Sequence, residues 1–127
     1  MIQLTNLCAP KAAKNTKRVT KTKRLAVYIR DRFTCQACGT DLRQVMACCI
    51  TLDHLEPRSE GGSNEGSNLV TLCWECNTSR GVRPWREFYP GGAISRIEKV
   101  RHEPLNEALA AALIDGTAGD EELEAVR

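Results

Sequence analysis

The apolar residues early in the chain follow a helical pattern. In residues 24–33, the side chains of Leu25, Tyr28, Ile29 and Phe33 recur close to an i, i+3, i+4 spacing. Residues with this spacing lie on one face of an α-helix. The pattern therefore predicts a short amphipathic helix whose apolar stripe faces a core.

Two β-leaning apolar runs follow, with a loop between them. The first run covers residues 44–54 and has no helix cap, and the second covers residues 68–72. The residues between them, 55–67, are dense in Gly, Ser, Asn and Pro, which are typical of loops. We therefore predict two strands joined as an irregular hairpin.

The remainder of the chain is predicted to be helical with short breaks, which makes the fold class α+β. Residues 73–81 contain no β-branched run, and Gly81 is well placed as the C-terminal cap of a short helix. The further expected elements are a turn or helical corner over 82–92, a helix over 93–101, a helix with Pro104 in its first turn that runs to about Ile114, and a frayed or weakly helical end over 116–127.

Charge is distributed unevenly along the chain. Residues 1–32 carry nine Lys or Arg and one acid, whereas residues 103–127 carry one basic residue and seven acids. The net charge of +2 therefore hides a basic start and an acidic end. We expect three parts: a flexible basic arm over 1–24, a functional domain over 25–90, and C-terminal helices with an acidic tail over 91–127.

The basic arm has the composition of a segment that contacts a nucleic-acid backbone. Lys and Arg bind phosphates with little sequence information, and the arm has no aromatic residue that would stack on bases. A solubilising disordered tail is the alternative. The residues predicted to contact DNA are Lys17, Arg18, Lys21, Lys23 and Arg24 in or next to the arm, and Arg80 and Arg83 later in the chain.

The sequence predicts a cytoplasmic protein with no membrane partner. Residues 1–10 lack both a basic region and an unbroken apolar stretch, and nowhere do about 18 apolar residues run together. In a reducing compartment, cysteines in close pairs are more often metal ligands than disulfides.

Four of the seven cysteines form two CxxC units. Cys35 and Cys38 make up the first unit, and Cys73 and Cys76 the second. Each unit can place two thiolates on one side of a tight turn, and two such turns complete a tetrahedral site of four sulfurs. The pattern predicts a structural zinc ion. Two buried cysteine pairs, or two disulfides, are the alternative.

Asp53 and His54 stand together at the end of the first predicted strand. Taken alone, they would be a strand-end carboxylate and a surface histidine. In the company of Asn68, Asn77 and the four cysteines, they indicate a catalytic site. Neighbouring side chains of a regular strand face opposite ways, so both can serve one site only if the strand ends or distorts there. We expect a bend at this point.

Two stretches resemble the HNH endonuclease family in its zinc-bearing form. They are CQACG at residues 35–39 and LDHLEPRSEGGSNEGSNLVTLCWECNTSRG at residues 52–81. The resemblance covers roughly residues 24–88 and makes residues 25–90 an HNH nuclease domain. It implies a ββα-metal fold, which is a hairpin and a helix stapled by a four-cysteine zinc site, with flanking helices. It also implies a bacterial or phage-infected cell.

The resemblance implies a role for each polar residue. Asp53 and Asn77 would hold a catalytic divalent metal, His54 would be the general base, and Asn68 would pin the loop. Asn77 stands where the family name has histidine, so the chain has an H-N-N pattern. Carboxylate and amide oxygens favour Mg²⁺ or Mn²⁺, and Ni²⁺ and Zn²⁺ are further candidates.

A metal-dependent DNA endonuclease is the function that these features predict together. A base activates water and a metal ion stabilises charge on the phosphate, and the resemblance implies products with 5′-phosphate and 3′-hydroxyl. One rival is a non-catalytic zinc-ribbon DNA-binding protein. Another is an assembly module whose partners are phage packaging proteins. The set of Asp53, His54 and Asn77 separates these functions, because a ribbon does not need it.

Overall fold

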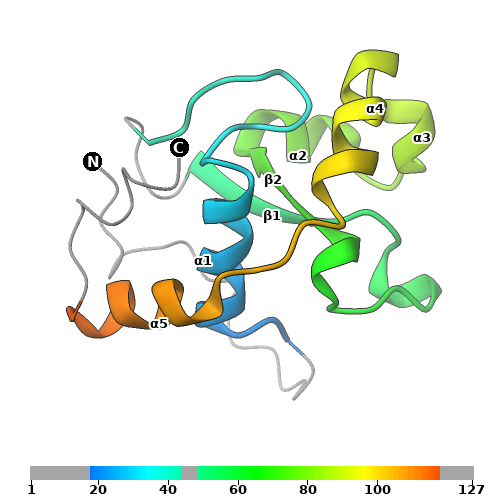
Figure 1. The fold of residues 1–127 in the computed structure, drawn as a ribbon. Helices are drawn as coiled ribbons and strands as arrows, with labels where there is room; N and C mark the ends of the chain where they lie inside the picture. Colours follow the sequence, from blue (N-terminus) through cyan, green and yellow to red (C-terminus); the bar gives the residue numbers. More distant parts are fainter. Residues whose placement is uncertain (1–17, 44–48, 118–127) are drawn as a thin grey trace.

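The computed structural model describes residues 18–43 and 49–117 as an α+β fold (Figure 1). The predicted segments 1–17 and 118–127 and the predicted strand residues 44–48 lie outside this description. The elements follow in the order α1 (Lys21–Arg30), β1 (Ile50–His54), η3 (Arg58–Glu60), η4 (Gly66–Asn68), β2 (Leu69–Cys73), α2 (Trp74–Arg80), α3 (Trp85–Phe88), α4 (Gly91–Val100) and α5 (Glu107–Asp115).

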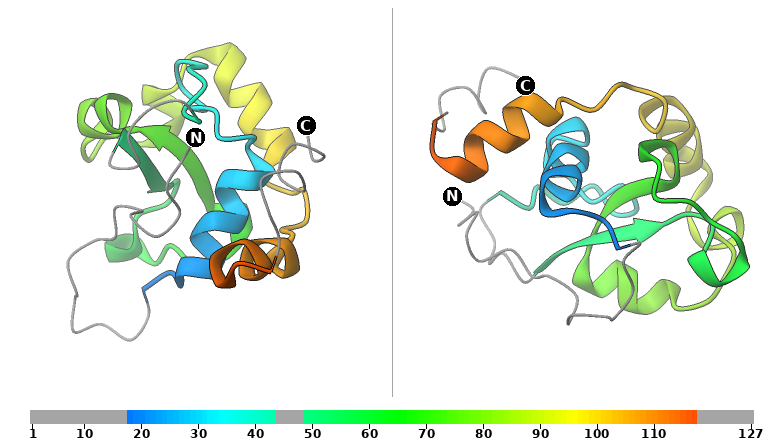
Figure 2. Two further views of the ribbon diagram at one scale, coloured as in Figure 1. Left: turned by 90° about the vertical axis from the view of Figure 1, so that its left-hand side faces the viewer. Right: turned by 90° about the horizontal axis from the view of Figure 1, so that it is seen from below.

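The predicted hairpin is confirmed as a two-stranded antiparallel sheet. β1 pairs with β2 from Ile50↔Cys73 to His54↔Leu69, so the pairing includes every residue of β1. α1 and α2 lie on opposite faces of this hairpin (Figure 2, right). The sequence β1–β2–α2 therefore forms a continuous ββα unit with α1 on its other face.

α1 contributes the largest share of buried apolar side chains next to the hairpin. Its predicted stripe is buried at Leu25, Tyr28 and Ile29, and Phe33 is buried just beyond the helix end. α5 packs against α1 and crosses it at a steep angle (Figure 1). The first and last described helices therefore cover each other, and the chain closes on itself around one core.

Several element boundaries differ from the sequence prediction because of capping residues. α1 begins at Lys21, since the Thr20 side chain caps it by accepting from Lys23 N at 3.1 Å. α5 begins at Glu107 rather than around Pro104, because Asn106 caps it by accepting from Leu109 N at 3.0 Å. The prediction of Gly81 as the C-terminal cap of α2 is confirmed, and its φ of 54° is one that glycine adopts readily.

A buried ion pair ties α1 to the hairpin. Arg30 Nε donates to Asp31 Oδ1 at 2.8 Å, and the same guanidinium donates to the carbonyls of Gly66 and Leu69. Asp31 Oδ2 accepts from the backbone N–H of Thr71 at 2.8 Å. The two charged side chains are 1% and 0% exposed. Their charges are therefore compensated inside the protein, and removing one leaves the other unpaired.

No helix in residues 18–43 and 49–117 has the length and apolar character that crossing a membrane requires.

We predict that Asp31→Ala lowers the free energy of unfolding by about 3–5 kcal/mol, because it strands the buried Arg30 charge. Chemical denaturation of the metal-loaded protein measures this change. Asp41→Ala is the matched control, since Asp41 pairs with Arg43 at the surface and its side chain is 51% exposed. A surface pair contributes at most about 1 kcal/mol. Equal effects of the two substitutions would contradict the assigned role of Asp31.

Candidate functional site

The four cysteines of the two CxxC units meet at one point. The sulfur atoms of Cys35, Cys38, Cys73 and Cys76 all lie within 4.8 Å of one another. Tetrahedral zinc with Zn–S bonds of about 2.3 Å requires sulfurs about 3.8 Å apart. The cluster therefore fits a single metal ion of this kind. Among the described residues, this is the one group of His, Cys, Asp or Glu side chains with such geometry.

Backbone geometry prepares both cysteine turns for a metal. Cys38 N donates to Cys35 Sγ at 3.5 Å, and Cys76 N donates to Cys73 Sγ at 3.4 Å. Burial raises the pKa of Cys38, but hydrogen bonds with Thr40, Cys35 and Cys76 together outweigh this effect and lower that pKa to about 7. Burial and the neighbouring cysteines raise the pKa of Cys76. A cation between the sulfurs relieves this repulsion, because it stabilises the thiolate form of all four.

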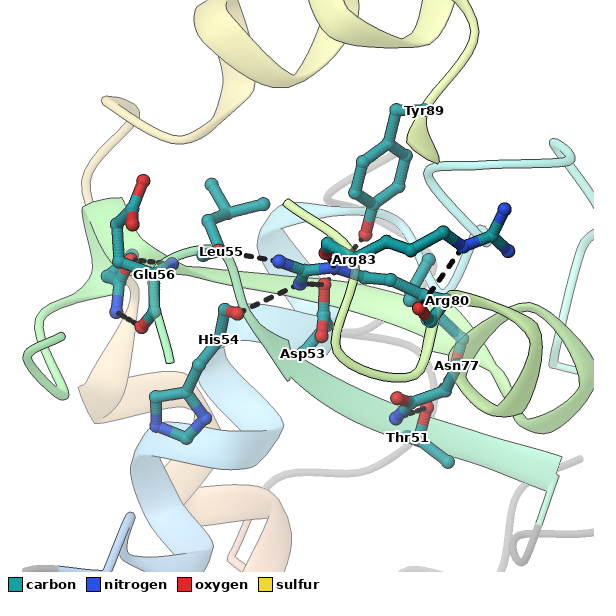
Figure 3. Close-up of polar contacts among 11 residues, drawn as sticks. Thr51, Asp53, His54, Leu55, Glu56, Asn77, Arg80, Arg83 and Tyr89 are labelled. Carbon is teal, nitrogen blue, oxygen red and sulfur yellow. Dashed lines mark hydrogen bonds and ion pairs between the residues drawn. The ribbon is translucent and has the colours of Figure 1, made fainter. Parts of the chain in front are cut away.

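Asp53 faces α2 and is almost fully enclosed. It is 7% exposed, and its Oδ2 accepts from Arg80 Nη1 at 2.5 Å and from the Tyr89 hydroxyl at 2.9 Å (Figure 3). Burial raises the pKa of Asp53, whereas Arg80 and Tyr89 lower it. Burial and the adjacent carboxylate raise the pKa of Tyr89, so its hydroxyl stays protonated and donates.

Arg80 was predicted as a phosphate contact, and the structure places it inside the protein. It is 3% exposed. Besides Asp53, its guanidinium donates to the backbone carbonyls of His54 at 2.9 Å, Leu55 at 2.7 Å and Arg83 at 3.0 Å. All guanidinium nitrogens of Arg80 therefore donate hydrogen bonds to oxygen atoms of the protein. In this arrangement, Arg80 joins the end of α2 to the end of β1.

His54 points to the other side of the hairpin from Asp53 (Figure 3). β1 remains paired through His54, and the backbone bends only at Leu55 and Glu56. The bend therefore follows the strand, and the two side chains keep their alternation. His54 Nε2 lies 2.8 Å from Asn64 Oδ1. Since an amide oxygen only accepts, Nε2 carries the proton in this contact.

Asn68 connects the two ends of the long loop. Its Oδ1 accepts from Glu56 N at 2.8 Å, and its Nδ2 donates to the carbonyls of Glu56 at 3.0 Å and Ser63 at 2.8 Å. The loop after β1 also approaches itself closely at Gly62, where an added Cβ would lie 1.8 Å from the Glu56 carbonyl oxygen. Asn68 and Gly62 together hold the loop in a compact form beside His54.

Asn77 lies on the face of α2 that covers β1. Its Nδ2 donates to Thr51 Oγ1 at 2.8 Å, and Thr51 Oγ1 donates to Leu72 O. No described residue hydrogen-bonds to the amide oxygen of Asn77. Because Thr51 and Asp53 are two apart in a regular strand, they share the face that α2 covers. The structure therefore brings Asp53 and Asn77 to one interface and places the His54 side chain outside it.

Apart from the buried Arg80, the predicted DNA-contacting residues fall into three groups. Lys17 lies outside the described residues. Arg18, Lys21 and Arg83 are exposed, whereas Lys23 and Arg24 are half-buried. Lys21, Lys23 and Arg24 belong to the first turn of α1 rather than to a flexible arm. Lys23 Nζ donates to the carbonyl of Asn64 at 3.0 Å, which brings the start of α1 next to His54.

Three residues of the site were missed in the sequence. Asn64 orients His54, Tyr89 binds Asp53, and Thr51 binds Asn77. Asn64 is one of several polar residues in a loop, and Tyr89 looks like an aromatic core residue. Thr51 alone carried a usable signal, because it stands two positions before Asp53 and so must share its face.

Comparison with known proteins gives one match. The family model described as HNH endonuclease matches residues 35–83, which contain all four cysteines and Asp53, His54, Asn68 and Asn77. Searches of curated proteins and of solved structures found no match.

We predict that Cys73→Ser abolishes stoichiometric zinc binding and the folded state together, since a structural zinc contributes about 10–16 kcal/mol. Zinc content and far-ultraviolet circular dichroism measure the two effects. Cys49→Ser is the matched control, because Cys49 lies just before β1 and outside the sulfur cluster. A Cys73→Ser protein that stays folded after chelation would refute a structural metal.

Proposed function

Because the HNH endonuclease family model matches residues 35–83, we propose that the protein is a metal-dependent endonuclease that hydrolyses DNA. The observation that carries the proposal is the state of His54. Its Nε2 donates to Asn64, and its Nδ1 has no hydrogen-bond partner among the described residues. An imidazole oriented through one nitrogen and open at the other has the arrangement of a general base.

His54 acts on the water that attacks the phosphorus atom. Nδ1 accepts a proton from this water, and Asn64 holds the ring through Nε2 while the imidazolium forms. The P–O bond to the 3′ oxygen then breaks, and that oxygen takes a proton from solvent. The products are a 3′-hydroxyl and a 5′-phosphate, and His54 releases its proton to solvent before the next turnover. Asn68 keeps the adjoining loop in place, so the base stays at a fixed position relative to the strand end.

Asp53 and Asn77 would hold the divalent cation on the α2 side of β1, and His54 lies on the other side. The cleaved phosphate would therefore lie across the end of β1, within reach of both this ion and His54. Asp53 and Asn77 each have one oxygen without a hydrogen-bond partner among the described residues, and hard oxygen ligands of this kind suit Mg²⁺ or Mn²⁺. When bound, the ion supplies positive charge to the phosphate oxygens as negative charge develops. The carboxylate and the amide reach this interface from β1 and α2. α2 carries Cys76 of the cysteine cluster, and β1 pairs with β2, which ends at Cys73 of the same cluster.

The start of α1 supplies the adjacent phosphate contacts. Arg18 and Lys21 are exposed, and Lys23 reaches the backbone of Asn64, the residue that holds His54. These positive charges therefore flank the proposed base. Such contacts bind DNA through its backbone, so we expect low sequence specificity.

We predict that His54→Ala lowers the rate of plasmid cleavage by about 10²- to 10⁴-fold in Mg²⁺ or Mn²⁺, because it removes the general base. His102→Ala is the matched control, since His102 is the other histidine of the chain and is exposed. Equal cleavage by wild type and His54→Ala would exclude His54 as the base. DNA binding without cleavage by the wild type in either metal would instead favour a non-catalytic DNA-binding protein.

We also predict that Lys21→Gln weakens DNA binding for all sequences alike and makes the slope of log K against log[salt] shallower by about 0.9, as expected for one lost phosphate contact. Fluorescence anisotropy with a labelled duplex at several salt concentrations measures both quantities. Lys99→Gln in α4 is the control, because it removes an exposed lysine far along the chain. The contact is absent if the two variants have the same affinity and slope.

A further inference from the structure

The two carboxylate oxygens of Asp53 have different surroundings. Oδ2 accepts from Arg80 and Tyr89, whereas Oδ1 has no hydrogen-bond partner among the described residues. Within the described part of the chain, Thr71 Oγ1 is the one buried side-chain nitrogen or oxygen that lacks a partner. Asp53 Oδ1 is therefore not sealed in the protein. Oδ2 is therefore held by two protein donors, and Oδ1 is available to a ligand.

Arg80 fixes this carboxylate relative to the backbone as well. The same planar guanidinium donates to the carbonyls of His54 and Leu55, at 2.9 Å and 2.7 Å. A guanidinium has its donors in a rigid fork, so these bonds cannot shift independently. The position of Asp53 is thus coupled to the backbone at the end of β1 (Figure 3).

We propose that Arg80 and Tyr89 are positioning residues that hold Asp53 Oδ2 so that Oδ1 is presented to the divalent cation as a single oxygen ligand. The inference rests on the proposed function. Asn77 lies one helical turn before Arg80, so one helix supplies both a ligand and the group that orients the other ligand. Partners behind a ligating carboxylate are worth about 10- to 100-fold in metal affinity or activity.

Tyr89→Phe tests the inference, because it removes one hydroxyl and keeps the ring. Tyr28→Phe is the matched control. The chain has two tyrosines; Tyr28 is 1% exposed and Tyr89 is 3% exposed, and the Tyr28 hydroxyl accepts from Arg24 instead. The probe is Mn²⁺ alone, titrated into the full-length zinc-loaded protein and followed by electron paramagnetic resonance. We expect about tenfold weaker Mn²⁺ binding for Tyr89→Phe and an unchanged affinity for Tyr28→Phe.

Cleavage as a function of Mn²⁺ concentration separates positioning from a structural role. If Tyr89 acts through the metal ligand, saturating Mn²⁺ restores most of the lost rate of Tyr89→Phe, whereas structural damage does not respond to the metal. Mn²⁺ affinities that are equal for Tyr89→Phe and Tyr28→Phe would overturn the inference, and so would a lost rate that Mn²⁺ does not restore.

Two further variants keep these outcomes distinct. If Tyr89→Phe does not fold, Arg80→Lys is compared with Arg86→Lys, an exposed arginine of α3, and the expected loss of Mn²⁺ affinity is about 10- to 100-fold for Arg80→Lys alone. Equal affinities of this pair would also overturn the inference. Asp53→Asn identifies the site itself. Asp53→Asn should abolish the Mn²⁺ binding of the wild type. If it does not, the proposed catalytic site fails, and the positioning role fails with it.

Discussion

The direct passage from β2 into α2 at Cys73 is the constraint on which the site depends. Cys73 is the last residue of β2, the N-cap of α2 and a member of the sulfur cluster. No loop intervenes, so a metal ion on Cys73 and Cys76 would set the direction in which the helix leaves the sheet. Asn77 and Arg80 follow within the next turn of that helix. Their positions over β1 are therefore inherited from the cysteines.

The far end of α2 is held by charge rather than by metal. Arg80 is buried against Asp53, and its guanidinium also donates to the carbonyls of His54 and Leu55 at the end of β1. Burying an ion pair costs free energy unless further hydrogen bonds compensate its charges, and here Tyr89 donates a second hydrogen bond to Asp53 Oδ2. A helix of seven residues is too short to be stable by itself, and α2 is therefore stabilised by these contacts at both of its ends.

Much of the fold and part of the candidate site could be predicted from the sequence, because the relevant signals are local. CxxC spacing, the Gly81 cap and the alternation along residues 50–54 each depend on a few neighbouring residues. The start of α1 was misplaced because Thr20 was not recognised as a cap among the basic residues. The hydrogen-bond partners of the site residues could not be predicted in this way, because they depend on residues far apart in the chain. Tyr89 reaches Asp53 across 36 positions, and no local pattern marks such a pair.

The packing of α5 on α1 bears on how the protein is made. α1 leaves the ribosome first, and the helix that covers it is completed about 85 residues later. At synthesis rates of about 5–20 residues per second, the apolar stripe of α1 waits about 4–17 s for this partner. The segment that resembles a nuclease lies wholly between the two helices. The face of α1 that α5 covers therefore stays without this partner until residue 115 has been made, and the segment matched by the family model is synthesised within that interval.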